Sequence, residues 1–324
     1  MTQISTAMGP LEPERLGVTL PHEHVFLTDS EIHDNFDVGW DEKAAVAQAV
    51  SKLNELKVSG IDTIVDLTVV GLGRNVQRIE RVAAQSSVNI VVATGYYTFQ
   101  DLSGLVEFRD VARPAGTSIL TEWFIGDIRD GIFGTSTRAG ILKCATDKPG
   151  VTAGVEKVLR SVAQAHRETG VPISTHTDSS TRRGLDQQRV FREEGVDLSR
   201  VVIGHCGDTT DIDYLKELLD AGSFIGLDRF GQDYMGASFD QRIDTVVTLI
   251  DAGYIDRLLL AHDGNFVNTF MEPDWNAREQ PDWDLEFIGR GVLPALRRRG
   301  VSEDQIDQMM VENPRRMLTP GVAY

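Results

Sequence analysis

The feature that most constrains the fold is a set of eight short apolar runs that alternate with amphipathic segments along the chain. The runs are rich in β-branched residues and are bounded by glycine or polar residues, as buried strands are. They span residues 17–24, 61–67, 88–94, 139–144, 171–176, 200–205, 223–228 and 257–263. Nearly continuous apolar strands that alternate with helices predict a parallel sheet covered by helices. Eight such units in 324 residues predict an α/β fold, a closed (β/α)₈ TIM barrel.

The segments between the runs have the apolar spacing of helices, and residues 41–60 are one example. Near the end of the chain, Ser302 and Gln305 fit a capping box for a last helix. We expect Asn313 and Pro314 to end that helix, because the residue before a proline disfavours helical backbone.

An open, doubly wound sheet is the alternative architecture. Its dinucleotide sites need Gly-x-Gly-x-x-Gly directly after the first strand, whereas Gly71 and Gly73 follow the second run and lack the third glycine. No linker-like composition or charge block divides the chain. The sequence therefore predicts one domain over residues 1–324.

Composition limits the partners. The chain is 41% hydrophobic and 25% charged, as in globular proteins with a sizeable core. Its net charge of -17 argues against nucleic acid as a partner, because phosphate binding needs a basic face. The absence of a signal-like start or a long apolar run predicts no membrane partner and a cytoplasmic location. Cys144 and Cys206 have no metal or redox spacing, and we expect buried free thiols.

Residues with metal-ligand chemistry fall at the carboxyl ends of the predicted strands. His22 and His24 lie two apart, so both side chains point to the same side of a strand. The other strand ends carry Lys143, His176, His205 and Asp263. In a TIM barrel these ends converge on one mouth, where active sites of this fold lie.

Imidazole and carboxylate ligands suit zinc, cobalt, iron or manganese, and more than four ligands suggest two ions. Taken singly, each residue has a plainer interpretation: the His22–His24 pair and His176 as structural histidines, and Lys143 as a surface lysine. A barrel without catalytic activity is a further alternative. The joint placement on strand ends favours metal-assisted hydrolysis.

Several motifs in the same order resemble the phosphotriesterase family of the amidohydrolase superfamily. They are Gly17-x-Thr19-Leu20-x-His22-Glu23-His24, Gly140-Ile141-Leu142-Lys143, Pro172-Ile173-Ser174-Thr175-His176-Thr177, Gly204-His205-Cys206-Gly207-Asp208-Thr209, Gly226-Leu227-Asp228-Arg229-Phe230-Gly231, Ala261-His262-Asp263 and Asn313-Pro314-x-Arg316. The resemblance covers nearly the whole chain.

The resemblance implies a binuclear centre of two divalent transition-metal ions, with zinc the first expectation. His22, His24 and Asp263 would hold the more buried ion, and His176 and His205 the more exposed one. Lys143, carboxylated by carbon dioxide, would bridge the two ions together with a hydroxide.

Within the family, two residues resemble those of the phosphotriesterase-like lactonases. Tyr97 matches the lactonase tyrosine beside the metals, and Arg229 stands where phosphotriesterases carry a histidine. We expect both to bind substrate and, with Asp263, to take part in catalysis. The alternative interpretation is that Tyr97 is an aromatic wall and Arg229 a structural partner of Asp208 or Asp228.

The resemblance thus implies a lactonase that opens N-acyl homoserine lactones and other γ- and δ-lactones, a quorum-quenching activity, with weak phosphotriester hydrolysis. A primary phosphotriesterase or another amidohydrolase is the alternative. We expect a small-molecule lactone substrate and a homodimer. The last long loop, 264–281, departs from the family pattern, which leaves the acyl-chain preference open.

Overall fold

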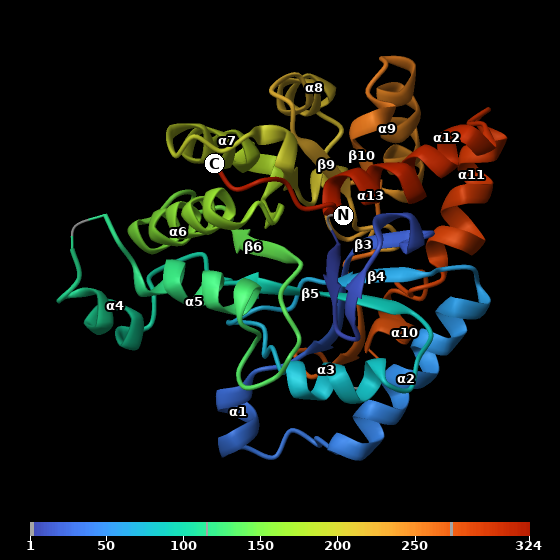
Figure 1. The fold of residues 1–324 in the computed structure, drawn as a ribbon. Helices are drawn as coiled ribbons and strands as arrows, with labels where there is room; N and C mark the ends of the chain where they lie inside the picture. The colour runs from blue at the N-terminus through green and yellow to red at the C-terminus, as the bar shows by residue number, and fades with distance from the viewer. Residues whose placement is uncertain (1–2, 115, 273–274) are drawn as a thin grey trace.

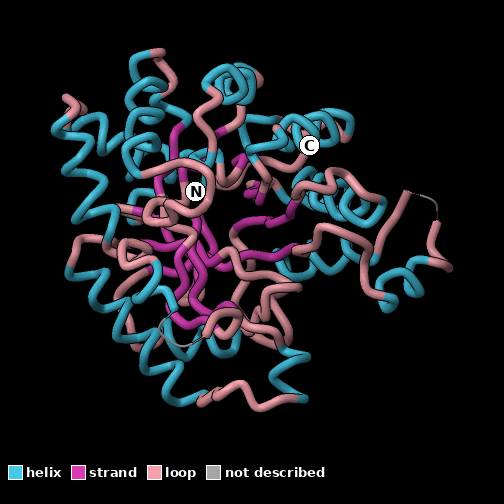
Figure 2. The backbone as a smooth tube through the Cα atoms, turned by 180° about the vertical axis from the view of Figure 1, so that it is seen from behind, coloured by secondary structure: helices cyan, strands magenta, loops and turns pink. Residues whose placement is uncertain are grey.

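A parallel sheet of nine strands forms the centre of the molecule (Figures 1 and 2). The computed structural model describes residues 3–114, 116–272 and 275–324. In sequence order the strands are β3 (Thr19–Leu27), β4 (Thr63–Asp66), β5 (Asn89–Gly95), β6 (Ile141–Ala145), β7 (Ile173–His176), β8 (Val201–Ile203), β9 (Phe224–Leu227), β10 (Leu258–Leu260) and β11 (Gly264–Asn268). Each of the eight predicted apolar runs overlaps one of these strands, which confirms the TIM-barrel prediction.

The last two strands close the sheet. Strand β10 pairs in parallel with β9, and β11 pairs in parallel with the first barrel strand β3. Only residues 261–263 separate β10 from β11, so together they occupy the eighth position of the barrel. We expected residue 264 to begin a loop, and this was wrong. Asp263 takes a left-handed backbone conformation, with φ of 51°, after which the chain returns to extended structure beside β3.

Helices surround the sheet, as Figure 2 shows in cyan around the magenta strands. They are α1 (Ser30–Asn35), α2 (Glu42–Val58), α3 (Val76–Ala83), α4 (Gly104–Asp110), α5 (Ile119–Arg129), α6 (Ala153–Thr169), α7 (Arg183–Glu193), α8 (Ile212–Asp220), α9 (Phe239–Asp251), α10 (Trp275–Glu279), α11 (Leu293–Arg298), α12 (Glu303–Asp307) and α13 (Asn313–Leu318). A short antiparallel hairpin, β1 (Ile4–Thr6) with β2 (Gly9–Leu11), precedes the barrel.

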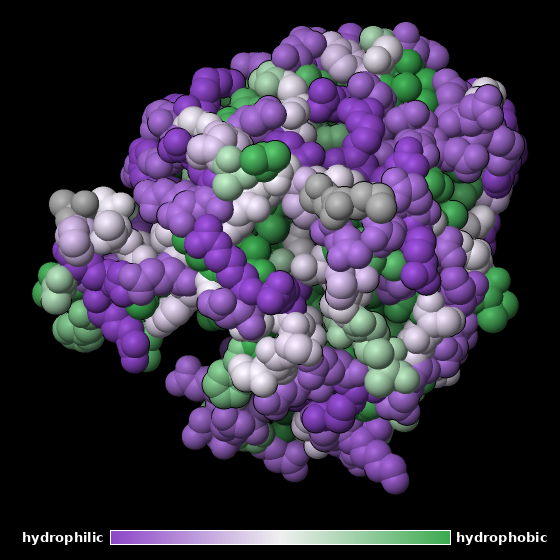
Figure 3. All heavy atoms as spheres, in the orientation of Figure 1, coloured by the Kyte–Doolittle hydropathy of each residue, from purple (hydrophilic) through white to green (hydrophobic). Residues whose placement is uncertain are grey.

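Burial follows the predicted pattern. Ala45, Ala49, Leu53 and Leu56 of α2 are buried on one face, at the three- and four-residue spacing of a helix packed on a sheet. The visible molecular surface is mainly hydrophilic, with apolar side chains scattered over it (Figure 3). Among the described residues, no helix combines the length and hydropathy needed to cross a membrane. Cys144 and Cys206 are buried and free, as expected.

The C-terminal helix corrects one prediction. Ser302 and Gln305 form the expected capping box. Asn313 and Pro314, however, do not end the helix, which continues as α13 to Leu318. A π-helical turn, η7 (Gln308–Glu312), precedes them and places Pro314 in the first turn of a new α-helical segment, where its missing N–H costs nothing.

Candidate metal centre

The structure brings the predicted ligand residues to one end of the barrel. His22 and His24 lie in β3, Lys143 in β6, His176 at the end of β7, His205 two residues after β8, and Asp263 between β10 and β11. Parallel strands bring their carboxyl ends together, so residues far apart in sequence become neighbours.

His22, His24 and Asp263 form one group. Nε2 of His24 lies 3.2 Å from Oδ1 of Asp263, and Nε2 of His22 lies 3.5 Å from the same oxygen. Nζ of Lys143 lies 3.0 Å from Nε2 of His22. One ligand atom from each of the two histidines and Asp263 lies within 4.8 Å of the others, so the three residues could hold an ion.

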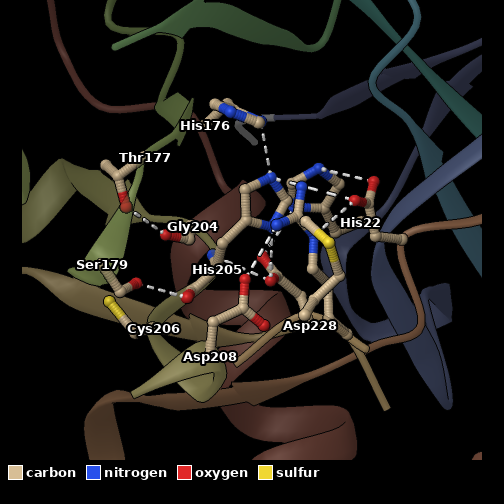
Figure 4. Close-up of polar contacts among 12 residues, drawn as sticks. His22, His176, Thr177, Ser179, Gly204, His205, Cys206, Asp208 and Asp228 are labelled. Carbon is tan, nitrogen blue, oxygen red and sulfur yellow. Dashed lines mark hydrogen bonds and ion pairs between the residues drawn. The ribbon is translucent and has the colours of Figure 1, made fainter. Parts of the chain in front are cut away.

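His176 and His205 form a second group beside the first. Nδ1 of His176 and Nε2 of His205 are 2.8 Å apart. The ring of His205 lies 4.9 Å from that of His22, measured between centroids, which places the two groups side by side. Figure 4 shows His205 with His176 on one side and Asp228 on the other.

Asp228, at the end of β9, orients one histidine from each group. Its Oδ2 accepts a hydrogen bond from Nδ1 of His22 at 2.7 Å, and its Oδ1 accepts one from Nδ1 of His205 at 2.9 Å. A carboxylate only accepts, so both rings carry their proton on Nδ1 and turn the lone pair of Nε2 into the site. From the sequence we considered Asp228 only as a partner of Arg229. Its place at a strand end was the signal for a role in the site.

The other two histidines also have side-chain partners, a carboxylate for His176 and a hydroxyl for His24. Nε2 of His176 lies 3.0 Å from Oδ2 of Asp147, so its Nδ1 is the free nitrogen that faces His205. Nδ1 of His24 lies 2.9 Å from Oγ1 of Thr68, so its Nε2 faces the site. Such hydrogen bonds fix ring orientation and raise the basicity of ligand histidines. We did not predict Asp147 or Thr68 as site residues from the sequence.

Burial favours the neutral form of three histidines in the site, which are His22, His176 and His205. Burial lowers the pKa of His176 to about 4, against the opposing effect of its hydrogen bond to Asp147. Burial also lowers the pKa of His22, with Lys143 acting in the same direction, and holds the pKa of His205 well below its usual value, with Arg229 acting likewise. Neutral imidazole is the form that binds metal.

Lys143 is fully buried, and this changes its chemistry. Burial lowers the pKa of its amine to about 8, although Asp263 and Asp228 act to raise it. A substantial fraction of the amine is therefore uncharged at mildly alkaline pH. An uncharged amine is a nucleophile, whereas an ammonium ion is not.

Arg229 belongs to a chain of ion pairs that begins at Asp263 and alternates between carboxylate and guanidinium groups. Its Nε donates to Oδ2 of Asp263 at 2.9 Å, and its NH1 donates to Oδ2 of Asp208 at 2.8 Å. Behind Asp208, NH1 of the buried Arg242 lies 2.9 Å from Oδ1. Burial alone would lower the pKa of Arg229, but Asp263 and Asp208 raise it above its usual value. Asp228, the other partner we considered, bonds the histidines instead.

Tyr97 stands at the edge of the second histidine group. Its hydroxyl lies 3.5 Å from Nδ1 of His176, and its ring packs edge-on against that of His176 with centroids 5.3 Å apart. Burial raises the pKa of the phenol, and Asp263 acts in the same direction. The phenol therefore keeps its proton over the physiological range and can donate it.

The donor set fits two divalent transition-metal ions. Ring nitrogens of four histidines lie near one another beside the Asp263 carboxylate, and such nitrogen and oxygen donors suit zinc and its neighbours. The unmodified amine of Lys143 lies among these atoms, although an ammonium ion would repel a divalent cation.

Three comparisons with known proteins agree. A model of the phosphotriesterase family matches residues 2–318. The chain is 51% identical to the phosphotriesterase homology protein of Mycobacterium tuberculosis, with 100% of both chains covered. It is 37% identical to the aryldialkylphosphatase of Saccharolobus solfataricus, over 95% of this chain and 97% of that protein.

Solved structures give the same result. The phosphotriesterase from Mycobacterium tuberculosis superposes with a TM-score of 0.96 at 50% identity, covering 99% of this chain and 100% of the other. A structure described as organophosphate hydrolysis engineered from a weak promiscuous lactonase template has a TM-score of 0.89 at 33% identity, covering 98% and 100%. The barrel and its polar mouth thus define an α/β-barrel hydrolase. The chain belongs to the phosphotriesterase family.

Proposed function

We propose that the protein is a binuclear metal-dependent lactonase that opens N-acyl homoserine lactones and other γ- and δ-lactones, with weak phosphotriester hydrolysis as a side activity. The observation that carries the proposal is the position of the Tyr97 hydroxyl, 3.5 Å from Nδ1 of His176, in the same site as the Arg229–Asp263 pair. The site thus holds both a proton donor and a proton acceptor.

In this proposal His22, His24 and Asp263 hold one ion, and His176 and His205 hold the other. When bound, the two ions would supply an acidified water and an electrophile that polarises the substrate oxygen. We further propose that Lys143 bridges them as a carbamate. The uncharged amine adds to the carbon of carbon dioxide, and the carbamic acid formed loses one proton, which leaves an anion with two ligating oxygens.

The protein side chains have separate roles in ring opening. Asp263 accepts the proton of the attacking water, and its hydrogen bond to Arg229 keeps the carboxylate in one orientation. Tyr97 donates its hydrogen bond to the carbonyl oxygen and then to the leaving alkoxide of the lactone. An alkoxide is a poor leaving group without a proton, so this donor matters more for lactones than for triesters with aryl leaving groups.

A primary phosphotriesterase is the second candidate, and the 37% identity to an aryldialkylphosphatase favours it. Both candidates share the metals and differ in substrate preference. The test is to measure kcat/KM for N-acyl homoserine lactones, simple γ- and δ-lactones and a paraoxon-like triester. Each is measured before and after chelation and again after zinc, cobalt or manganese is restored. We expect lactones to be preferred and activity to depend on metal. A preference for the triester would support the second candidate, and full activity without metal would exclude both.

A further inference from the structure

Glu23 is a fully buried carboxylate that the proposed mechanism does not use. It lies between His22 and His24 in β3, so strand alternation points its side chain to the opposite face. Its Oε1 accepts hydrogen bonds from the backbone N and from Nδ1 of His262, at 3.0 and 2.9 Å, and its Oε2 accepts one from the backbone N of Gly264 at 2.7 Å. One carboxylate therefore holds both residues that flank Asp263.

The backbone of Asp263 needs this support. Its φ of 51° lies in the left-handed region, which residues other than glycine rarely adopt. Its own N–H donates to the carbonyl of His22 at 3.1 Å. Three successive N–H groups, at residues 262, 263 and 264, are thus bound by His22 and Glu23.

His262 extends the same contact to a distant part of the chain. Its Nδ1 donates to Glu23, so its Nε2 is free to accept, and the backbone N–H of Ile288 donates to it at 2.9 Å. Ile288 begins the π-helical turn η6 (Ile288–Val292). The Glu23–His262 pair therefore fixes the chain both at residue 264 and at residue 288.

The described part of the segment between these two points lines a cavity of about 1310 Å³ against α2. Phe270, Trp283 and Leu285 belong to this lining. Segment 264–288 follows directly after Asp263, so a shift of its ends would move the Asp263 carboxylate and the aromatic lining together.

We propose that Glu23 and His262 are positioning residues, which hold the Asp263 carboxylate in its orientation and set the positions of Gly264 and Ile288 relative to the site. The effect on turnover rests on the proposed function, in which Asp263 accepts a proton. The claim that Glu23 and His262 hold the backbone in place rests only on the hydrogen bonds of this pair.

Three variants distinguish the contact of Glu23 with residues 262 and 264 from the contact of His262 with Ile288. Glu23→Gln replaces an acceptor oxygen with an N–H group that must face another donor. His262→Asn keeps a side-chain N–H near the position of Nδ1 and removes the acceptor for Ile288. His262→Gln places a carbonyl oxygen near the position of Nε2 and removes the donor to Glu23. His166→Asn is the matched control, because His166 is equally buried and bonds through both ring nitrogens, to Val171 and Tyr324, outside the site.

The readouts are amide hydrogen exchange at residues 264 and 288, and kcat and KM with metal in excess. We expect Glu23→Gln and His262→Gln to speed exchange at Gly264 and to lower kcat about 10- to 100-fold, the range for groups that orient metal ligands. We expect His262→Asn to speed exchange at Ile288 and to raise KM with a smaller change in kcat. His166→Asn should change neither amide.

Unchanged exchange at both amides in all three variants would overturn the proposal, as would kcat and KM changes no larger than those of His166→Asn. If the wild-type protein hydrolyses neither lactones nor triesters, the proposed function fails. Amide exchange at Gly264 and Ile288 alone then decides whether Glu23 and His262 hold these two residues in place.

Discussion

Nε of Arg229 lies 2.9 Å from Oδ2 of Asp263, and the same guanidinium reaches Asp208 through NH1 at 2.8 Å. Burial would raise the pKa of Asp263, but the adjacent guanidinium of Arg229 holds it well below its usual value. The Asp263 carboxylate is therefore charged and fixed in orientation. A lysine could meet one of the two carboxylates but lacks the planar fork that spans both.

Arg229→Lys should consequently lower kcat/KM for lactones about 10- to 100-fold, the range for groups that orient ligand residues, with metal content unchanged. Steady-state kinetics with metal analysis checks this. Arg182→Lys is the matched control, because Arg182 binds Asp211 at the exposed surface and should keep full activity. If Arg229→Lys and Arg182→Lys lost equal fractions of kcat/KM, Arg229 would have a purely structural role.

Asp228→Asn should weaken metal binding. The Asp228 carboxylate accepts from Nδ1 of both His22 and His205, and an amide can accept on only one of its two atoms. We expect the affinity for metal to fall about 10- to 100-fold. Competition with a chromogenic chelator measures it. Asp147 bonds only one of the site histidines, His176, so Asp147→Asn should have a smaller effect, and the opposite ranking would contradict the role given to Asp228.

Tyr97→Phe tests substrate class. The variant keeps the ring that packs on His176 and removes the hydroxyl that lies 3.5 Å from it. Lactone hydrolysis should fall more than triester hydrolysis, because an aryl leaving group departs without a proton. The measurement is the ratio of the two kcat/KM values in variant and wild type. An unchanged ratio would make Tyr97 an aromatic wall.

His166 should make stability depend on pH. Burial lowers the pKa of its imidazole below the usual 6.5, so the folded state binds protons less readily than the unfolded state. Its contribution is complete above pH 6.5 and is lost as the pH falls below that value. Urea unfolding at pH 7.5 and 5.5 should show a smaller loss for His166→Gln than for wild type at the same metal loading. Equal losses in both proteins would contradict the assignment.

Most of the proposed metal ligands could be predicted from the sequence, for a physical reason. The carboxyl ends of parallel strands meet in a barrel, so a histidine at a strand end is near every other such residue. That signal also applied to Asp228, which is the last residue of the seventh run. Asp147 and Thr68 each lie two residues beyond a strand, β6 and β4, where the direction of the side chain depends on the path of the loop.

Two predictions failed where the backbone departs from regular geometry. The proline at 314 indicates a helix end only if the preceding turn is α-helical, and here that turn is a π-helix. Gly264 suggested a loop, whereas the left-handed conformation of Asp263 lets a strand resume beside β3. Neither irregularity is encoded in local hydrophobic periodicity. Two residues of the expected loop, 273 and 274, lie outside the described residues.

Metal content per chain tests the central claim, a binuclear centre bridged through Lys143, most directly. The wild-type protein should contain close to two transition-metal ions per chain by mass spectrometry. Lys143→Ala should lose both metal and activity, and acetate or propionate should restore part of each by occupying the vacated space. Lys52→Ala is the control, because Lys52 donates to the carbonyl of Phe266 at 2.9 Å, away from the ligand residues, and should keep both ions. Two tightly bound ions and normal lactone hydrolysis in Lys143→Ala without added acid would contradict the account.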